Sequence, residues 1–118
     1  MAKAMTLVGL DVHARQTHAA VLHLDSGELA VSRLRMAPEE VVSFLAGLPG
    51  PVVAVYEAGP TGFGLARAAA GRGIDVRVVA PGSDPKGSGD RVKTDRRDAI
   101  RLARLLAARE LSFAFVPS

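Results

Sequence analysis

The chain has 118 residues, and its 15 Lys and Arg against 12 Asp and Glu give a formal net charge of +3. This length fits one domain, since folded domains cluster at about 100–150 residues. Hydrophobic residues make up 48% and cysteine is absent, which excludes a disulfide scaffold, a thiolate metal site and a disordered chain. The apolar run near the N-terminus is interrupted by Asp11 and is too short for a signal or membrane helix, so we expect a soluble, cytoplasmic protein.

The first third of the chain predicts three strands, at Thr6 to Val12, Thr17 to Leu24 and Glu28 to Met36. Between the second and third strands lies Asp25-Ser26-Gly27, a short turn in which the glycine supplies a positive φ. These two strands are therefore predicted to form an antiparallel hairpin.

Helices and strands alternate in the rest of the chain. Ala37 to Leu48 is predicted to be a helix, because Pro38 and two Glu stand at its start and apolar residues recur at helical spacing. Pro51 to Glu57 is a nearly continuous apolar run, typical of a strand that is covered on both faces. A second helix at Phe63 to Arg72, a fifth strand at Ile74 to Ala80 and a third helix after the next loop complete the prediction.

That loop, Pro81 to Lys93, is rich in Gly, Pro and Ser and is predicted to be mobile. We place the domain at residues 1–112 and a linker, or a last extended piece, at residues 113–118. The predicted order β-β-β-α-β-α-β-α is typical of an α/β fold with an RNase H-like mixed sheet of five strands. In that sheet the first and fourth strands lie side by side.

Four acidic residues stand where this topology would bring them together. Asp11 closes the first strand, Glu57 closes the fourth, and Asp95 and Asp98 head the apolar stripe of the third helix at about 100° per residue. Carboxylates directed toward a core are costly unless they are hydrogen-bonded or neutralised, and a divalent cation neutralises several at once. The pattern favours a Mg²⁺ site, at which two ions can stabilise the attacking and leaving oxygens of a phosphoryl transfer.

A second interpretation remains open for the two helix acids. Asp95 has the position of an N-cap and Asp98 that of the acid at N3, both of which helix N-termini favour without any metal. The glycine-rich Gly59 to Gly64 segment after the fourth strand is only a weak phosphate-loop signal, because it lacks the Gly-Lys-Ser/Thr ending.

Basic residues concentrate near the third helix: Lys86 to Arg109 holds eight Lys and Arg against three Asp. Such a patch indicates a polyanionic partner, most often nucleic acid, although a solvated helix face is an equally good interpretation of the charge alone. The predicted phosphate contacts are Lys86, Arg91 and Lys93 in the loop and Arg96, Arg97, Arg101 and Arg104 on the helix, where the last three are expected opposite the acids.

Two further side chains flank the predicted acids. His13 shares the strand face of Asp11 under period-two alternation and could touch the site, but an ordinary polar edge residue is the favoured interpretation. Tyr56 precedes Glu57 and is predicted to point to the opposite face, into the core.

Four motifs resemble one known family. The segments GLDVH (Gly9 to His13), VYEAGPTGFGL (Val55 to Leu65), VVAP (Val78 to Pro81) and GDRVKTDRRDAIRLARLL (Gly89 to Leu106) look like the N-terminal domain of the DEDD-type insertion-sequence transposases. These are the IS one-ten family, related to the Piv invertases, and their domain resembles the Holliday-junction resolvase RuvC.

The resemblance implies both a chemistry and partners. The family acids map onto Asp11, Glu57, Asp95 and Asp98, which would bind Mg²⁺, or Mn²⁺ as a substitute, for DNA strand cleavage and exchange at the bacterial nucleoid. Family members are similar in having a C-terminal domain with a nucleophilic serine, which we expect this chain to lack, and some are guided by a structured bridge RNA. A homo-oligomer is also expected.

Two alternatives stay open. The chain could be a non-catalytic, truncated module that binds guide RNA or DNA and oligomerises, with its acids serving as helix caps. It could also be an ATP-binding fragment of the sugar-kinase superfold, which shares the strand order but has phosphate loops that this sequence lacks. Metal affinity that depends on the four acids would separate the catalytic reading from the first alternative.

Overall fold

The computed structural model describes residues 5–13, 15–35, 37–57, 62–80 and 95–114, with the backbone alone at 95 and 96. The predicted elements are confirmed, with ends that differ by a few residues at most. In chain order they are β1 (Thr6–Val12), β2 (Gln16–His23), β3 (Leu29–Arg35), α1 (Pro38–Ala46), β4 (Val52–Glu57), α2 (Gly64–Ala70), β5 (Asp75–Val79) and α3 (Asp95–Ala107). The loop predicted at 81–93 lies outside the described residues.

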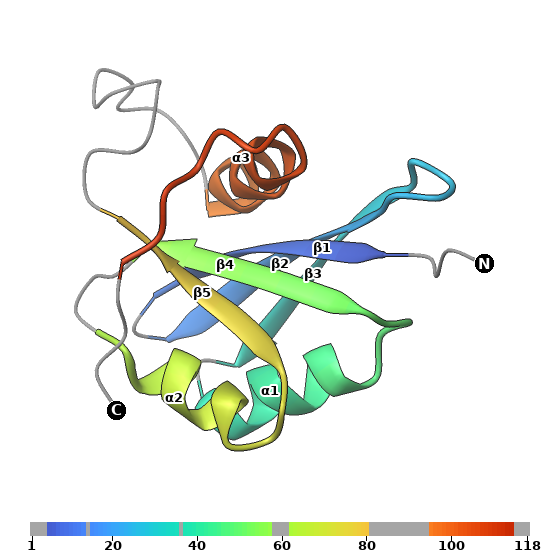
Figure 1. The fold of residues 1–118 in the computed structure, drawn as a ribbon. Coiled ribbons are helices and arrows are strands. Elements are labelled where there is room, and N and C mark those ends of the chain that lie inside the picture. The colour runs from blue at the N-terminus through green and yellow to red at the C-terminus, as the bar shows by residue number, and fades with distance from the viewer. Residues whose placement is uncertain (1–4, 14, 36, 58–61, 81–94, 115–118) are drawn as a thin grey trace.

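The strands form one five-stranded mixed sheet in the order β3-β2-β1-β4-β5 (Figure 1). β2 pairs antiparallel with both β1 and β3, whereas β1, β4 and β5 run parallel to one another. This is the RNase H-like topology, and the predicted neighbours β1 and β4 pair directly, with Leu10 opposite Tyr56. Asp11 and Glu57 therefore occupy the next position on two adjacent parallel strands.

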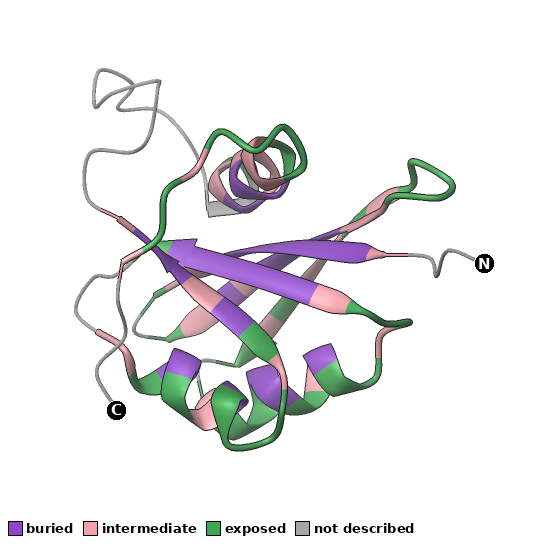
Figure 2. Ribbon diagram, viewed as in Figure 1, coloured by how far each residue is buried: buried purple, intermediate pink, exposed green. Residues whose placement is uncertain are grey.

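Helices cover both faces of the sheet: α1 and α2 lie on one face and α3 lies on the other (Figure 1). The sides of the helices that face the sheet are buried and their outer sides are exposed (Figure 2). The central strands are therefore covered on both faces, which explains the nearly continuous apolar run of β4. None of the helices in the described part of the chain has the length and apolar character needed to span a lipid bilayer.

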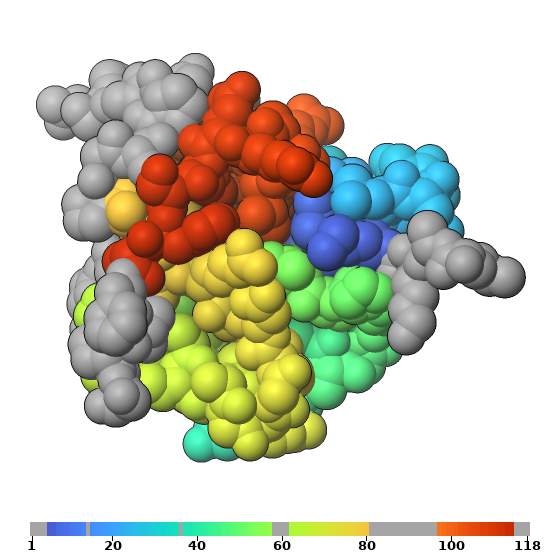
Figure 3. Space-filling view, viewed as in Figure 1, coloured from blue at the N-terminus to red at the C-terminus, as the bar shows by residue number. Residues whose placement is uncertain are grey.

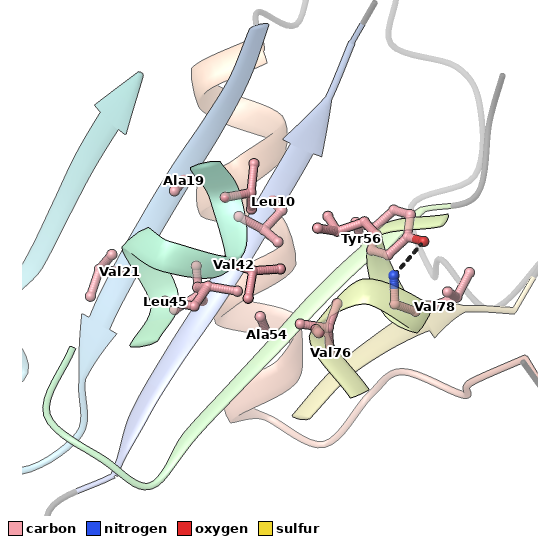
Figure 4. Packing of buried hydrophobic residues seen from close by; sticks show 14 residues of the cluster. Leu10, Ala19, Val21, Val42, Leu45, Ala54, Tyr56, Val76 and Val78 are labelled. Atoms are coloured by element: carbon pink, nitrogen blue, oxygen red, sulfur yellow. Dashed lines mark hydrogen bonds between the residues drawn. The ribbon is translucent and has the colours of Figure 1, made fainter. Parts of the chain in front are cut away.

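The larger core lies beneath α1 and α2. Leu10, Val42, Leu45 and Tyr56 meet there with exposed fractions of 1% or less (Figure 4). Tyr56 thus points into the core, as predicted, and the alternation of the strand directs Glu57 to the α3 face.

The Tyr56 hydroxyl links the core to the segment that follows β4. It donates a hydrogen bond to the carbonyl oxygen of Gly62 (2.8 Å) and accepts one from the N–H of Ala66 (3.4 Å; Figure 4). Gly62 has a φ of +60°, a conformation that glycine adopts without strain. Burial raises the pKa of Tyr56 above its ordinary value of 10.0, although the Ala66 N–H and the Arg67 charge act in the opposite direction.

α3 lies close to β1 because small residues face each other between the helix and the strand. Gly9 of β1 lies beneath Ala99, Leu102 and Ala103 of the helix. A Cβ atom at Gly9 would collide with the carbonyl oxygen of Ala99 and lie 2.6 Å from the amide nitrogen of Ala103. The absence of that atom lets the helix backbone lie directly on the strand.

The chain after α3 returns to the free edge of β5. Phe113 forms an isolated antiparallel bridge with Val79, flanked by N–H to O hydrogen bonds of 2.8 Å from Ala80 to Ser112 and from Ala114 to Val78. In the space-filling view the chain from the end of α3 to residue 114, in red, lies against β5 (Figure 3). Covering this edge removes unpaired backbone groups that would otherwise favour intermolecular strand pairing.

The substitution Gly9→Ala is expected to destabilise the fold by about 1–3 kcal/mol or more, because the new methyl group meets helix backbone rather than a movable side chain. Urea unfolding measures the change. Gly64→Ala is the matched control, since nothing lies within 4 Å of its added Cβ. Equal stability of the Gly9 variant and the control would show that the helix can move away from the strand at little cost.

The substitution Tyr56→Phe is expected to lower the free energy of unfolding by about 1–3 kcal/mol at neutral pH, because it leaves two backbone groups without their partner. The pKa of Tyr56 is raised in the folded state, so the neutral phenol favours folding. This contribution is fully present below pH 10.0, the ordinary pKa of the unfolded chain, and is lost as the pH rises through the folded-state pKa.

The phenol can be followed on its own, since the chain has one Tyr and no Trp. Its absorbance in the folded protein is expected to titrate above pH 10.0. A native titration at or below that value, or a Tyr56→Phe variant that loses stability as steeply as the parent in alkali, would contradict this assignment.

Candidate metal centre and nucleic-acid interface

Asp11 lies near the end of β1 on the face that α3 covers. It follows Gly9 by two residues, roughly 6.6 Å along the strand, and alternation places both on the same face. Its side chain is only 15% exposed. His18 is its register partner on β2, and Glu57 occupies the neighbouring position on β4. Polar side chains from three adjacent strands thus share one end of the sheet.

His13 contacts this acid directly. Its Nε2 lies 2.9 Å from Oδ2 of Asp11, and its side chain is 46% exposed. His13 therefore contacts Asp11, as its shared strand face allowed, but it is also an exposed residue at the strand end, so its part in a metal site stays a prediction. The signal that identified this contact was the two-residue spacing from Asp11, which places both side chains on one side of the strand.

Asp98 lies in the first turn of α3 and is paired with Arg101, one turn later. Oδ1 of Asp98 and Nη2 of Arg101 are 3.7 Å apart, and the side chains are 20% and 18% exposed. This separation suits an ion pair but exceeds a direct hydrogen bond. The expectation that Arg101 lies opposite the acids is wrong, because residues three apart in a helix are neighbours on its surface.

The direction of α3 brings Asp98 toward Asp11. Leu106 and Ala107, near the end of the helix, line one cavity together with Leu7 at the start of β1. Ala99, near the beginning of the helix, lies over Gly9. The helix therefore runs antiparallel to β1, and its N-terminal turn lies toward the end of the strand that carries Asp11.

Glu57 is placed differently from the other two described acids. It ends β4 in register with Val79 of β5 and is exposed to solvent. Among the residues whose side chains the structure describes, no three His, Asp or Glu gather closely enough to hold a metal ion. The side chain of Asp95 lies outside that set. The four-acid site accordingly remains a prediction.

The donor chemistry at this end of the sheet nevertheless suits a hard divalent cation. Asp11, Glu57 and Asp98 offer carboxylate oxygens, which Mg²⁺ prefers, and no thiolate occurs in the chain. Two of the three acids are largely shielded from water. In the chemistry of their donor atoms, the residues present therefore fit Mg²⁺.

The predicted nucleic-acid contacts are described only in part. Arg97 and Arg104 are exposed on α3, as a phosphate-binding role requires, whereas Arg101 is held beside Asp98. The side chains of Lys86, Arg91, Lys93 and Arg96 lie outside the described residues. The basic interface stays a prediction that rests on two exposed arginines.

Comparison with known proteins identifies the family. The family model of the IS110 (IS one-ten) DEDD transposases matches residues 8–118. The y4qE protein of Sinorhizobium fredii (strain NBRC 101917 / NGR234), named as a transposase, is 60% identical over 62 residues, which cover 52% of this chain and 16% of that protein. The transposase for insertion sequence element IS1533 of Leptospira borgpetersenii is 35% identical over 108 residues, which cover 88% of this chain and 31% of that protein.

No solved structure matches the chain. The chain spans less than a third of the length of either relative. The family match nevertheless includes β4, α3 and β1 from Val8 onward, and these three elements carry the candidate acids. Together with the RNase H-like sheet, it shows that the chain belongs to the IS110 family of DEDD transposases.

Proposed function

We propose that this chain is the catalytic domain of a DNA transposase, in which Asp11, Glu57, Asp95 and Asp98 hold Mg²⁺ for strand cleavage and exchange. The observation that carries the proposal is the antiparallel seam between β1 and α3, which directs Asp98 toward the end of the strand that bears Asp11. Glu57 comes next to Asp11 in register on β4.

The roles of the described residues follow from their surroundings. Asp11 and Asp98 are shielded carboxylates on rigid elements, so they are suited to fixing a cation relative to the sheet. Glu57 is exposed and is suited to the side that faces DNA. When bound, Mg²⁺ supplies charge stabilisation for the attacking and leaving oxygens of the phosphodiester. Arg101 supplies positive charge to Asp98 in the absence of a cation.

Nucleic acid would approach over α3. Arg97 and Arg104 are exposed there, and further Lys and Arg residues precede the helix in the sequence. Contacts of this kind neutralise phosphates and position a duplex without reading its bases. On the family resemblance alone, we extend the proposal to a guide RNA that selects the DNA, and to a homo-oligomer completed by a serine-bearing domain.

A second candidate is a non-catalytic module that binds nucleic acid, with the helix acids acting as caps. The exposure of Arg97 and Arg104 on α3 suits this candidate as well, because phosphate contacts need no metal. Metal binding that depends on individual acids separates the two candidates, because caps need no cation.

Asp11→Asn and Asp98→Asn are each expected to abolish Mn²⁺ binding while the fold and its thermal midpoint change little, since each removes a charged ligand but keeps the side-chain volume. NMR with isotope-labelled protein measures both effects: at low Mn²⁺ occupancy, amide broadening should centre on residues 11, 57, 95 and 98. Asp25→Asn is the matched control, because Asp25 is an exposed acid in the β2–β3 turn.

Retained Mn²⁺ affinity in either site variant would count against the metal centre. Broadening scattered over surface acids, to the same degree in the parent and in Asp25→Asn, would return Asp98 to a capping role and support the non-catalytic module.

The double substitution Arg97→Ser/Arg104→Ser is expected to weaken binding of duplex DNA to a similar extent for unrelated sequences, because phosphate contacts carry no base preference. The slope of log affinity against log salt concentration should fall by about 1 for each arginine that contacts a phosphate. Fluorescence anisotropy at several salt concentrations measures both quantities.

Arg72→Ser is the control for this experiment, since Arg72 is exposed beyond the end of α2, in the layer on the other face of the sheet. An equal loss of affinity in Arg72→Ser would mean that net charge alone governs binding. An unchanged salt slope in the double variant would remove α3 from the interface.

A further inference from the structure

The contact between His13 and Asp11 has a defined direction. Nε2 of His13 lies 2.9 Å from Oδ2 of Asp11. When Asp11 is ionised, as a metal ligand must be, its carboxylate only accepts hydrogen bonds, so Nε2 carries the hydrogen and donates it. The imidazole is therefore a donor to this acid through a specified nitrogen.

The backbone holds His13 in place for this contact. His13 follows the last residue of β1, and its N–H donates to the carbonyl oxygen of Gln16 at the start of β2 (2.9 Å). The short connection between two paired strands thus carries the imidazole beside the acid. Because the backbone of His13 is hydrogen-bonded to the first residue of β2, the sheet determines the position of the donor.

The surroundings of Asp11 make this bond more than a surface contact. Exposed ion pairs contribute little because water competes for both partners. Asp11 is 15% exposed, although His13 is 46% exposed. Across β2, His18 is the register partner of Asp11 on the same face. The carboxylate of Asp11 thus has His13 beside it along the chain and His18 beside it on the neighbouring strand. A hydrogen bond that holds Oδ2 also determines the direction in which Oδ1 points.

We propose that His13 is a positioning residue, which holds the Asp11 carboxylate through Oδ2 in the orientation required for binding a divalent cation. The inference rests on the proposed function, because it needs Asp11 to be a metal ligand. Carboxylates that bind metals are commonly hydrogen-bonded in turn, and loss of such an outer partner lowers metal affinity about 10–100-fold. Without the donor, the side chain of Asp11 must be ordered at the moment of binding.

Isothermal titration with Mn²⁺ at one fixed pH tests this role. His13→Ala is expected to bind Mn²⁺ about 10–100-fold more weakly than the parent. His13→Gln keeps an N–H donor at similar reach and is expected to recover most of the affinity. His23→Ala is the matched control, since His23 lies at the other end of β2, opposite Thr6, and should bind as the parent does.

The outcomes distinguish the inference from the proposed function. If Asp11→Asn binds Mn²⁺ as well as the parent does, the metal centre fails, and the role of His13 fails with it. If Asp11→Asn loses binding while His13→Ala retains it, only the role of His13 is overturned. Equal loss in His13→Ala and His13→Gln would also overturn it, because the donor would then not be what matters.

A second measurement needs no variant and remains decisive if His13→Ala does not fold. In the parent protein, the ¹⁵N resonance of His13 Nε2 should shift on titration with diamagnetic Mg²⁺, because its acceptor becomes a metal ligand. The Nε2 resonance of His23 should not move. An unchanged His13 resonance at saturating Mg²⁺ would overturn the inference.

Discussion

The close approach of α3 to Gly9 is the contact on which the arrangement of the site depends. The missing Cβ lets the backbone at Ala99 and Ala103 rest on β1, and this contact sets both the position and the direction of the helix. Asp11 lies two residues beyond the contact on the strand, and Asp98 lies one residue before it on the helix. The packing of small residues therefore brings the two acids toward one end of the seam.

Charged side chains lie between β1 and α3, shielded from water in a place where a protein core would ordinarily hold apolar residues. Asp11, Asp98 and Arg101 are each 20% exposed or less, and shielded charges are costly unless they are paired. Each acid has a basic side chain nearby: a hydrogen bond links Asp11 to His13, and a longer ion pair links Asp98 to Arg101. The two pairs differ in length, and only the first has the geometry to fix a carboxylate. The opposite face of the sheet carries the large apolar core and the Tyr56 hydroxyl. The residues that contribute most to the core and the candidate site residues therefore lie on different faces of the sheet.

The sequence predicted the elements well because their signals are local. The glycine turn between β2 and β3, the apolar run of β4 and the proline at the start of α1 each act over a few residues. The prediction for Arg101 was wrong because it used only the angle of each residue around an isolated helix. In the structure, the side chain of Arg101 is paired with the carboxylate of Asp98, three residues earlier. For His13 the two-residue spacing gave the correct face, but its hydrogen bond to Asp11 could not be predicted, because that contact depends on how the chain turns after β1.

By itself, the sequence determined the order of the strands and helices, the RNase H-like class and the identity of the candidate acids, because period, turn chemistry and motif spacing are encoded along the chain. The tertiary structure decided which acids are shielded, which bases lie beside them and in which direction α3 crosses the sheet. These properties depend on residues that are far apart in sequence, such as Gly9, which packs against Ala99, and Leu7, which lines the same cavity as Leu106. Close packing determines such contacts, and no pattern within one segment of the chain specifies them.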